Sequence, residues 1–498
     1  MLKNNSSRSF LELPYKDLRE FLSRLEDQGE LLIVKSEVNW DLEIGAILRR
    51  ATDLGEDWPA VQFDQIKDYG EGHSLVANTL SNFRRYALAL DLPKDTPPLE
   101  MVREYKERLR YPISPRLVNE GPCQENIIIG EQVDLYKFPT PKWNIRDGGK
   151  YFGTSCCAIT KDPETGWTNV AVYRNIIHDK QHLGIFIGKT KHAMVMSQKH
   201  KQQNKPMPIA ITVGQDPINL IAGYHNAEAE ESEWEIAGGL RKAPVELVKC
   251  KTIDLEVPAT AEIVIEGEWL LNELREEGPY GEYSGYYGGE RAARPVIRVK
   301  AITHRNNAIH TGSILGKPIT ETHVMSAIGH SAKLEQVLKD QLKLEIKSVY
   351  SHPWTIGHAV FVSARRDILG LGKRIAHAVW GSRIGYRKDY VIIVGEDVDV
   401  TNLGEVFWAI TSRCKPDRDI VISPNEPASH LLTSLTPEDR RLGKGAHVVM
   451  EATFPADWPT EWVPKVCDWG HIPDEIKTLV KQRWREYGFR EPPPSQSN

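Results

Sequence analysis

Cysteine is scarce in this sequence of 498 residues, and long apolar runs are missing. The six cysteines include no CxxC pair and are too sparse for a disulfide framework, so the adjacent Cys156 and Cys157 are expected in a core. No apolar run approaches the length of a membrane span, and the polar first residues lack the apolar centre of a signal peptide. These absences predict a cytoplasmic protein without a membrane span.

An excess of positive charge is also missing. The formal net charge is -5, from 63 lysines and arginines against 68 aspartates and glutamates, which disfavours nucleic acid as the main partner. Hydrophobic residues make up 40% of the chain and charged residues 26%, which is typical of a globular protein of about two to four domains.

The order of predicted elements divides the chain into three domains. Residues 1–120 mix helices and strands, beginning with an amphipathic helix that Gly29 ends, and predict an α+β domain. Residues 121–318 carry many short strands punctuated by glycine and proline, which is typical of a barrel or sandwich. Over residues 319–498 helices, one of them at 331–342, alternate with strands. This alternation predicts a doubly wound α/β domain with a terminal helix.

The stretch from Glu276 to Tyr287 concentrates three carboxylates and four tyrosines. Glu277 and Glu282 are five positions apart with Gly-Pro-Tyr-Gly between them, and glycine and proline favour a turn over a helix or strand. A turn can aim both carboxylates into one cavity, which suits acid/base chemistry. An ordinary surface loop explains the same residues and remains the alternative.

Asn169 and Arg174 bracket a short predicted strand. Their positions have opposite parity, so a twist or bulge is needed for both side chains to serve one site. Arginine suits the binding of a carboxylate or phosphate through two parallel hydrogen bonds. An arginine at a strand end with its charge in solvent is the alternative.

Two histidines and a further carboxylate complete the candidates. His178 and His182 have the i, i+4 spacing of a helical zinc pair, but Asp179-Lys180-Gln181 between two β runs predicts a hairpin turn, which removes the helix. Glu233 lies in an acidic run that leads to a pair of glycines and could approach a ligand closely. A solvated acidic face explains that run equally well.

Together these segments resemble the UbiD family of reversible decarboxylases, which includes ferulic acid decarboxylase and the ubiquinone-pathway enzyme. The segment Glu277-Gly278-Pro279-Tyr280-Gly281-Glu282 matches the family's E-G-P-[FY]-G-[ED] loop. Further segments similar to family motifs are Thr168-Asn169, Arg174, Lys191-His192, Ser232-Glu233 and Thr411-Ser412-Arg413. The resemblance runs across most of the chain and implies a carboxy-lyase.

The resemblance also implies the fold and its division of labour. Residues 121–318 would form a split β-barrel that binds the flavin, between the N-terminal α+β domain and the C-terminal α/β domain. Residues 319–498 would serve oligomerisation and form a wall of the substrate site. The assembly would be a homodimer or a homohexamer.

Prenylated FMN is the cofactor that the resemblance implies, supplied by a separate flavin prenyltransferase of the UbiX type. A cationic side chain shortly before the apolar strand at Val391 would bind its phosphate, and Arg383 and Lys388 are both candidates. The other implied cofactor-binding residues are Thr168, Asn169, Val170, Arg174, Lys191, His192 and Glu233.

Two metal ions are implied in the same way. Asn169, His192 and Glu233 would hold a manganese or similar divalent ion, for which oxygen ligands and one imidazole are suitable. A potassium ion would touch the backbone at Val170, Ala222 and Gly223.

The implied reaction is a reversible, non-oxidative decarboxylation that begins with a 1,3-dipolar cycloaddition between the cofactor and a substrate double bond next to the carboxylate. Carbon dioxide leaves, a protein acid protonates the adduct carbon, and cycloelimination releases the product. Arg174 would pair with Glu277 and keep it ionised, and Glu282 would carry the proton.

The implied substrate wall is polar. Tyr283, Ser326 and Arg387 would line it in place of aliphatic side chains. This favours a polar aromatic or heteroaromatic acid among the aromatic and α,β-unsaturated acids that such enzymes take.

Two other classes of function remain open from the sequence. A zinc-dependent hydrolase would use His178, His182 and Glu233. A non-catalytic flavin-binding scaffold would need the carboxylates only to shape a loop.

Overall fold

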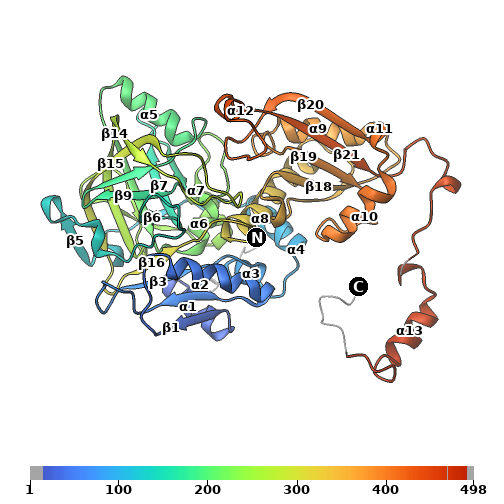
Figure 1. Cartoon of the computed structure of the whole chain (residues 1–498), viewed down its shortest axis with the longest axis horizontal. Coiled ribbons are helices and arrows are strands. Elements are labelled where there is room, and N and C mark those ends of the chain that lie inside the picture. Colours follow the sequence, from blue (N-terminus) through green and yellow to red (C-terminus); the bar gives the residue numbers. More distant parts are fainter. Residues whose placement is uncertain (1–14, 468, 491–498) are drawn as a thin grey trace, which may run out of the picture.

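The computed structural model describes residues 15–467 and 469–490, arranged as three β-sheets of four or more strands with their covering helices (Figure 1). The central sheet, the N-terminal sheet and the C-terminal sheet lie in different parts of the molecule, and the chain beyond them runs out as an arm that carries α13 (Asp474–Gln482) (Figure 1). No helix within the described residues is long and apolar enough to cross a membrane.

The N-terminal part is a four-stranded sheet with helices. Asp17 caps α1 by accepting a hydrogen bond from the Glu20 backbone N–H, and Leu18, Phe21 and Leu25 are buried on one face, as predicted. The strand order is β1-β2-β3-β16, so the last strand comes from far along the chain. The elements are α1 (Leu18–Asp27), β1 (Leu31–Val34), α2 (Glu43–Ala51), β2 (Ala60–Phe63), β3 (Ser74–Ala77), α3 (Phe83–Ala89), α4 (Pro98–Arg108) and β16 (Ile309–Gly312).

The central part is a nine-stranded antiparallel sheet. Its order is β6-β9-β10-β15-β14-β11-β7-β8, with β5 paired to β15. The adjacent Cys156 and Cys157 point into cores on opposite faces of β7, and both are buried, as expected. The strands are β5 (Asn126–Ile129), β6 (Tyr151–Gly153), β7 (Cys156–Lys161), β8 (Thr168–Ala171), β9 (Asn175–Asp179), β10 (His182–Ile185), β11 (Met207–Val213), β14 (Ile263–Glu277) and β15 (Ala292–His304).

A closed barrel is not found among the described strands. The pairing runs along an open path from β6 to β8, and no ladder joins these two end strands. The predicted β character of residues 121–318 is therefore confirmed, while the barrel is not. Smaller elements complete this part: α5 (His192–Gln202), α6 (Pro217–Gly223), α7 (Glu233–Arg241) and a sheet of β4 (Arg116–Leu117), β12 (Glu246–Lys249) and β13 (Glu256–Pro258).

The C-terminal part is a five-stranded sheet in the order β17-β18-β19-β21-β20. Strands β18, β19 and β21 are parallel, and β17 and β20 are antiparallel edges. Its elements are α8 (Glu321–Glu335), a π-helical segment (Gln336–Gln341), β17 (Ile346–Tyr350), β18 (Ala359–Ala364), α9 (Leu371–Gly381), β19 (Tyr390–Val394), α10 (Leu403–Arg413), α11 (Pro416–Asp419), β20 (Ile420–Pro427), α12 (Pro437–Leu442) and β21 (Lys444–Ala452).

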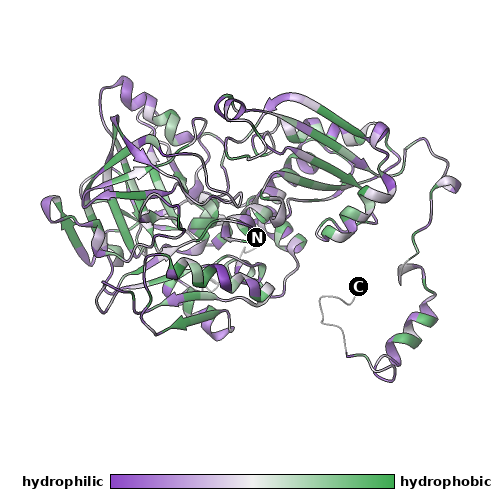
Figure 2. Cartoon of the chain, viewed as in Figure 1, coloured by the Kyte–Doolittle hydropathy of each residue, from purple (hydrophilic) through white to green (hydrophobic). Residues whose placement is uncertain are grey.

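Helices cover both faces of this sheet. Alternate residues of β19 enter two different cores, Val391 with Ile375 of α9 and Ile392 with Val406 of α10. The strands are accordingly hydrophobic along their length (Figure 2). The predicted α/β alternation is confirmed, as is the parallel arrangement at β19.

Helix α8 joins the parts of the molecule and differs from its prediction. It begins at Glu321, ten positions before the predicted start at Ser331, because Thr320 and His323 form a capping box there. Its apolar residues share a core with Met101 and Tyr105 of α4. The buried carboxylate of Glu321 accepts the Leu80 backbone N–H at 2.9 Å, so the N-terminus of α8 is anchored to the N-terminal part.

A buried ion pair provides a test of this packing. The Arg85 guanidinium is inaccessible to solvent and donates to Glu30 at 3.1 Å and to the Trp58 carbonyl at 2.7 Å. Burial lowers the pKa of Arg85 to about 10, against the opposing effect of Glu30. We expect Glu30→Ala to lower the free energy of unfolding by about 3–5 kcal/mol, because it leaves a buried cation without its partner.

Urea denaturation monitored by tryptophan fluorescence measures this loss. The exposed pair Arg365–Asp367 gives the control, since Arg365→Ala removes an ion pair from the surface and should leave the transition unchanged. Equal transitions for Glu30→Ala and the control would contradict the assignment.

Candidate active site

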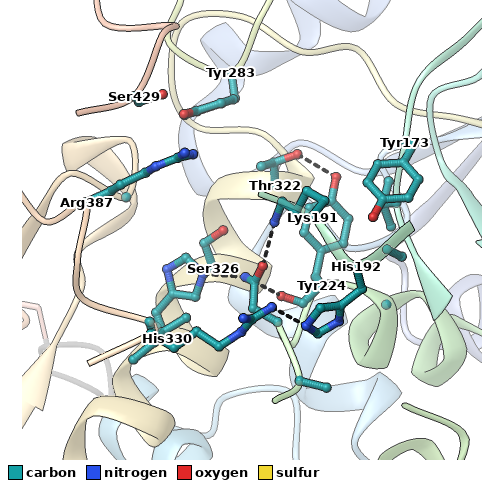
Figure 3. A pocket seen from close by; sticks show the side chains of 18 of the residues that line it. Tyr173, Lys191, His192, Tyr224, Tyr283, Thr322, Ser326, His330, Arg387 and Ser429 are labelled. Carbon is teal, nitrogen blue, oxygen red and sulfur yellow. Dashed lines mark hydrogen bonds between the residues drawn. The ribbon is translucent and has the colours of Figure 1, made fainter. Parts of the chain in front are cut away.

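A cavity of about 280 Å³ lies where the central sheet, α8 and the C-terminal sheet meet (Figure 3). Strand β8 and the residues after it form one side, and the N-termini of α5 and α7 open onto it. Helix α8 contributes Thr322, His323, Ser326 and His330. The C-terminal part contributes residues 356–358, 383–384 and 386–388 and Ser429.

The two carboxylates of the acidic loop share one guanidinium. Arg174 donates from Nε to Glu277 Oε1 at 2.9 Å and from Nη2 to Glu277 Oε2 at 3.0 Å, and its Nη1 contacts Glu282 Oε1. Glu277 is the last residue of β14, and Gly278 follows with φ of +91°, which lets the chain turn and return Glu282 to the same arginine. All three side chains are buried, at 9% exposed or less. The rings of Phe186 and Tyr280 lie 4.2 and 5.0 Å from the guanidinium carbon.

Residues 147–151 hold this loop in place and were not among the predicted site residues. Asp147 accepts the Gly281 backbone N–H at 2.9 Å, and the Gly148 N–H donates to the Pro279 carbonyl at 2.9 Å. The Tyr151 hydroxyl donates to Glu277 Oε1 at 2.8 Å. The only local indication in the sequence is the Asp-Gly-Gly run before a strand, which is also typical of an ordinary turn.

The carboxylate and imidazole at one end of the cavity carry perturbed pKa values. Glu233 begins α7, and its Oε2 accepts the Val170 backbone N–H at 3.0 Å. Burial raises the pKa of Glu233 to about 8. Burial, with Arg383 and Lys191 adding to it, lowers the pKa of His192 to about 4, and Arg383 contacts the ring at Nε2.

This donor set fits a divalent ion. Asn169, His192 and Glu233 line the same cavity and offer an amide, an imidazole and a carboxylate, a combination suited to manganese or magnesium. Such an ion would favour the ionised carboxylate and the neutral imidazole that burial and charge otherwise set apart. No group of three or more His, Cys, Asp or Glu side chains within the described residues could hold a metal, so an amide ligand is required here.

The neighbouring wall is strongly cationic. Lys191, Arg383, Arg387 and Lys388 all line the cavity, against the single carboxylate of Glu233. Burial lowers the pKa of Lys388 to about 7, and its Nζ donates to the Gly357 carbonyl at 2.7 Å. Burial, with Arg387 and Arg383, lowers the pKa of Lys191 to about 8. An anion such as a phosphate would relieve this crowding of positive charge.

Helix α8 fixes the junction between the acidic loop and the cavity. His323 Nδ1 accepts the Thr320 backbone N–H at 2.9 Å, so the proton is on Nε2, which donates to the Tyr283 carbonyl at 2.7 Å. Burial lowers the pKa of His323 to about 4, which keeps the ring neutral. Tyr283, the residue after Glu282, thereby enters the cavity wall.

The predicted site residues fall into two connected groups. Outside the cavity lining are Thr168 and Ala222, together with the cluster of Arg174, Glu277 and Glu282, which reaches the cavity through Tyr283. The cavity is lined by Asn169, Val170, Lys191, His192, Gly223, Glu233, Tyr283, Ser326, Arg383, Arg387 and Lys388.

The histidines of the alternative zinc set do not join Glu233. His178 and His182 lie on the strands of the β9–β10 hairpin, and His182 Nδ1 lies 2.8 Å from Asp179. Neither histidine lines the cavity. The predicted hairpin is therefore present, and the helical spacing that a zinc pair requires is absent.

Comparison with known proteins shows similarity along nearly the whole chain. Residues 22–109, 116–318 and 323–452 match the models of the N-terminal, Rift-related and C-terminal domains of 3-octaprenyl-4-hydroxybenzoate carboxy-lyase. Pyrrole-2-carboxylic acid decarboxylase of Pseudomonas aeruginosa is 32% identical over 95% of this chain and 98% of its own length. Phenolic acid decarboxylase of Sedimentibacter hydroxybenzoicus is 34% identical, covering 95% of this chain and 99% of its own.

Solved structures show the same likeness. Vanillic acid decarboxylase of Sedimentibacter hydroxybenzoicus in a closed form has a TM-score of 0.86 and 33% identity, covering 95% of this chain and 99% of that one. The UbiD-class enzyme HmfF of Pelotomaculum thermopropionicum in complex with FMN has a TM-score of 0.81 and 30% identity, covering 93% and 99%. A dimeric form of HmfF in complex with prFMN has a TM-score of 0.78 and 29% identity, covering 93% and 99%.

The close approach of residues 148 and 278 can be tested directly. A Cβ on Gly148 would lie 2.3 Å from the Gly278 carbonyl oxygen, so we expect Gly148→Ala to push the acidic loop away. The cost should be about 1–3 kcal/mol of folding stability, as for overpacked sites. Hydrogen exchange of the backbone over residues 277–287 should become faster, and thermal unfolding should shift downward.

Gly70→Ala serves as the control, because a Cβ there meets nothing within 4 Å. Unchanged hydrogen exchange over residues 277–287 in Gly148→Ala would refute the clamp.

Proposed function

The chain belongs to the UbiD family of carboxy-lyases, and we propose on this basis that its cavity decarboxylates an aromatic, heteroaromatic or α,β-unsaturated acid with the help of prenylated FMN. The observation that carries the proposal is one buried guanidinium, Arg174, held between Glu277 and Glu282 beside a cationic cavity. The named relatives act on phenolic, pyrrole-2-carboxylic and vanillic acids, which supports an aromatic or heteroaromatic substrate.

The cofactor site is proposed along the cavity from β8 to the C-terminal sheet. The complexes of HmfF with FMN and prFMN support a flavin. Lys388, Lys191 and Arg383 would bind its phosphate, and Asn169, His192 and Glu233 a divalent ion next to it. Thr168 and Arg174 would contact the flavin, and the backbone at Val170, Ala222 and Gly223 a potassium ion.

The chemistry would be divided between cofactor and protein. When bound, prenylated FMN supplies the dipolar centre that accepts the electrons left as carbon dioxide departs. The protein would contribute orientation, a buried charge for the substrate carboxylate and a proton. A flavin prenyltransferase of the UbiX type would supply the cofactor, the central sheet would form the flavin-binding split barrel, and the chain would assemble as a homo-oligomer.

Arg174 is proposed to bind the substrate carboxylate. It already makes two parallel hydrogen bonds to Glu277, which Tyr151 also supports, so that pair is the firmly fixed one. The contact to Glu282 uses only Nη1. A substrate carboxylate would compete for this nitrogen, and Glu282 would lose its counter-charge.

Glu282 is proposed as the proton donor for this reason. A buried carboxyl without a counter-charge favours its neutral, protonated form. The protonated form can deliver a proton to the ring or chain carbon that carbon dioxide leaves. Glu277 retains Arg174 and Tyr151 and stays the charged partner.

Other classes of function have less support. The hydrolase set of His178, His182 and Glu233 is not assembled, and no relative named above is a hydrolase. A non-catalytic flavin-binding scaffold would hold flavin without turning over any acid, so it is an outcome of the next experiment.

Replacement of the proposed acid gives the sharpest test. Glu282→Gln keeps the size of the side chain and removes the proton, so we expect kcat for the flavin-loaded enzyme to fall by about 100- to 10,000-fold. Flavin content, read from the absorption spectrum, should stay as in the wild type. Carbon dioxide release from a panel of aromatic acids measures the rate.

Glu276→Gln is the matched control, because Glu276 is an exposed neighbour whose nearest cation, Arg291, lies 3.9 Å away on the surface. Full turnover by Glu282→Gln would remove it from the role of acid. A wild type that binds flavin and releases carbon dioxide from none of the acids would point to the scaffold.

The pH dependence of flavin binding distinguishes the two candidate phosphate ligands. Because burial lowers the pKa of Lys388 to about 7, its positive charge is lost as pH rises above 7, whereas Arg383 stays charged. We expect the Kd of FMN for the apo-protein to rise between pH 7 and 9. Lys191, with a pKa of about 8, contributes in the same direction.

In Lys388→Met the slope of log Kd against pH should fall by up to about one, since one titrating cation is gone. Arg383→Met should weaken binding with the slope unchanged. Fluorescence titration measures both, and an unaltered slope in Lys388→Met would exclude Lys388 as the titrating ligand.

A further inference from the structure

His358 and Asp389 form a side-chain pair at the amino ends of two neighbouring strands. Each residue comes directly before its strand, β18 or β19, and the parallel register places Ala359 opposite Tyr390. The preceding residues are therefore neighbours, and His358 Nδ1 lies 2.8 Å from Asp389 Oδ2. Both side chains are 9% exposed, and His358 lines the cavity.

The carboxylate determines which imidazole nitrogen faces the cavity with a free lone pair. Within the described residues, His358 Nδ1 and both Asp389 oxygens have no further hydrogen-bond partner, so the pair is restricted to these two groups. A carboxylate beside Nδ1 keeps the proton there and leaves Nε2 as an acceptor. Nε2 lies 3.5 Å from the Tyr283 hydroxyl, and the two rings stack at 11° with centroids 6.3 Å apart.

The acceptor at Nε2 has spare capacity. A separation of 3.5 Å is at the upper limit for a hydrogen bond, so Tyr283 satisfies Nε2 only weakly. A ligand hydroxyl or N–H at a normal distance of about 2.8–3.0 Å would bind it better.

Polar groups surround this acceptor on the cavity side. The side chains of Tyr283, Ser429 and Arg387 are turned toward one another across the cavity (Figure 3). Arg387 has no ion-pair partner within residues 15–467 and 469–490, and its guanidinium lies over the ring of Tyr386. An acceptor, two hydroxyls and a guanidinium fit a ring that carries a hydrogen-bond donor on an oxygen or nitrogen. A hydrocarbon ring would leave all of them unpaired.

We propose that His358, oriented by Asp389, recognises a hydrogen-bond donor on the substrate ring, either a phenolic hydroxyl or the N–H of a heteroaromatic ring. His358 is then a specificity-determining residue and Asp389 a positioning residue. This inference rests on the proposed function, because it places the ring of the acid against the wall formed by Tyr283.

Matched acids that differ only in the donor test the inference. The flavin-loaded enzyme is assayed with 4-hydroxybenzoate against 4-methoxybenzoate, and with pyrrole-2-carboxylate against furan-2-carboxylate. Equilibrium binding of each acid is measured on the same protein by calorimetry. We expect the acid with the donor to be favoured by about 10- to 100-fold in at least one pair, in both kcat/KM and Kd.

Variants assign the preference to the pair. His358→Ala should reduce the preference to within about threefold, by weakening the acid with the donor while leaving its methoxy or furan counterpart unchanged. His358→Gln, whose amide oxygen can accept, should restore part of the preference, and Asp389→Asn should reduce it. His377→Asn is the control, since His377 is an exposed residue on α9 that contacts only the ring of Trp380.

The outcomes separate this inference from the proposed function. An unchanged preference in a folded, flavin-loaded His358→Ala would overturn the inference, and so would a wild type that treats both members of each pair alike. Preferential binding of the acids with a donor, without carbon dioxide release, would support the inference and refute the proposed function. If His358→Ala does not fold, His358→Gln and the wild-type comparison decide.

Discussion

One guanidinium shared by two carboxylates is the interaction on which the site depends. Arg174, Glu277 and Glu282 are all buried, and each would be costly there without the others. The arrangement leaves one net negative charge, which Tyr151 partly offsets by its hydrogen bond to Glu277. The protein therefore has to hold the acidic loop rigidly, and residues 147–151 do this through backbone contacts instead of further charges.

The opposite charge is concentrated at the other end of the cavity. Lys191, Arg383, Arg387 and Lys388 come from two different parts of the chain, and burial lowers the pKa of both lysines. Helix α8 lies between the two ends and positions Tyr283 through His323. The cavity thus has one end suited to anions and another where a proton and a negative charge are kept close together.

Local chemistry in the sequence predicted the residues of both ends but not what holds them. The glycines and proline between Glu277 and Glu282 imply a turn, and a turn is present. Asp147, Tyr151 and the His358–Asp389 pair could not be predicted, because their partners are brought close only by strand pairing over long separations. The C-terminal sheet also presents the amino ends of β18 and β19 to the cavity, whereas open α/β sheets usually bind ligands at carboxyl ends.

The N-terminal sheet has a consequence for the synthesis of the chain. Strand β3 ends at Ala77, and its partner β16 begins only at Ile309, after the whole central sheet. While a ribosome makes the intervening residues, the edge of β3 has no partner from its own sheet and is open to wrong pairing. The N-terminal region therefore completes its fold only after the central sheet has emerged, and a fragment cut between the two would expose that edge.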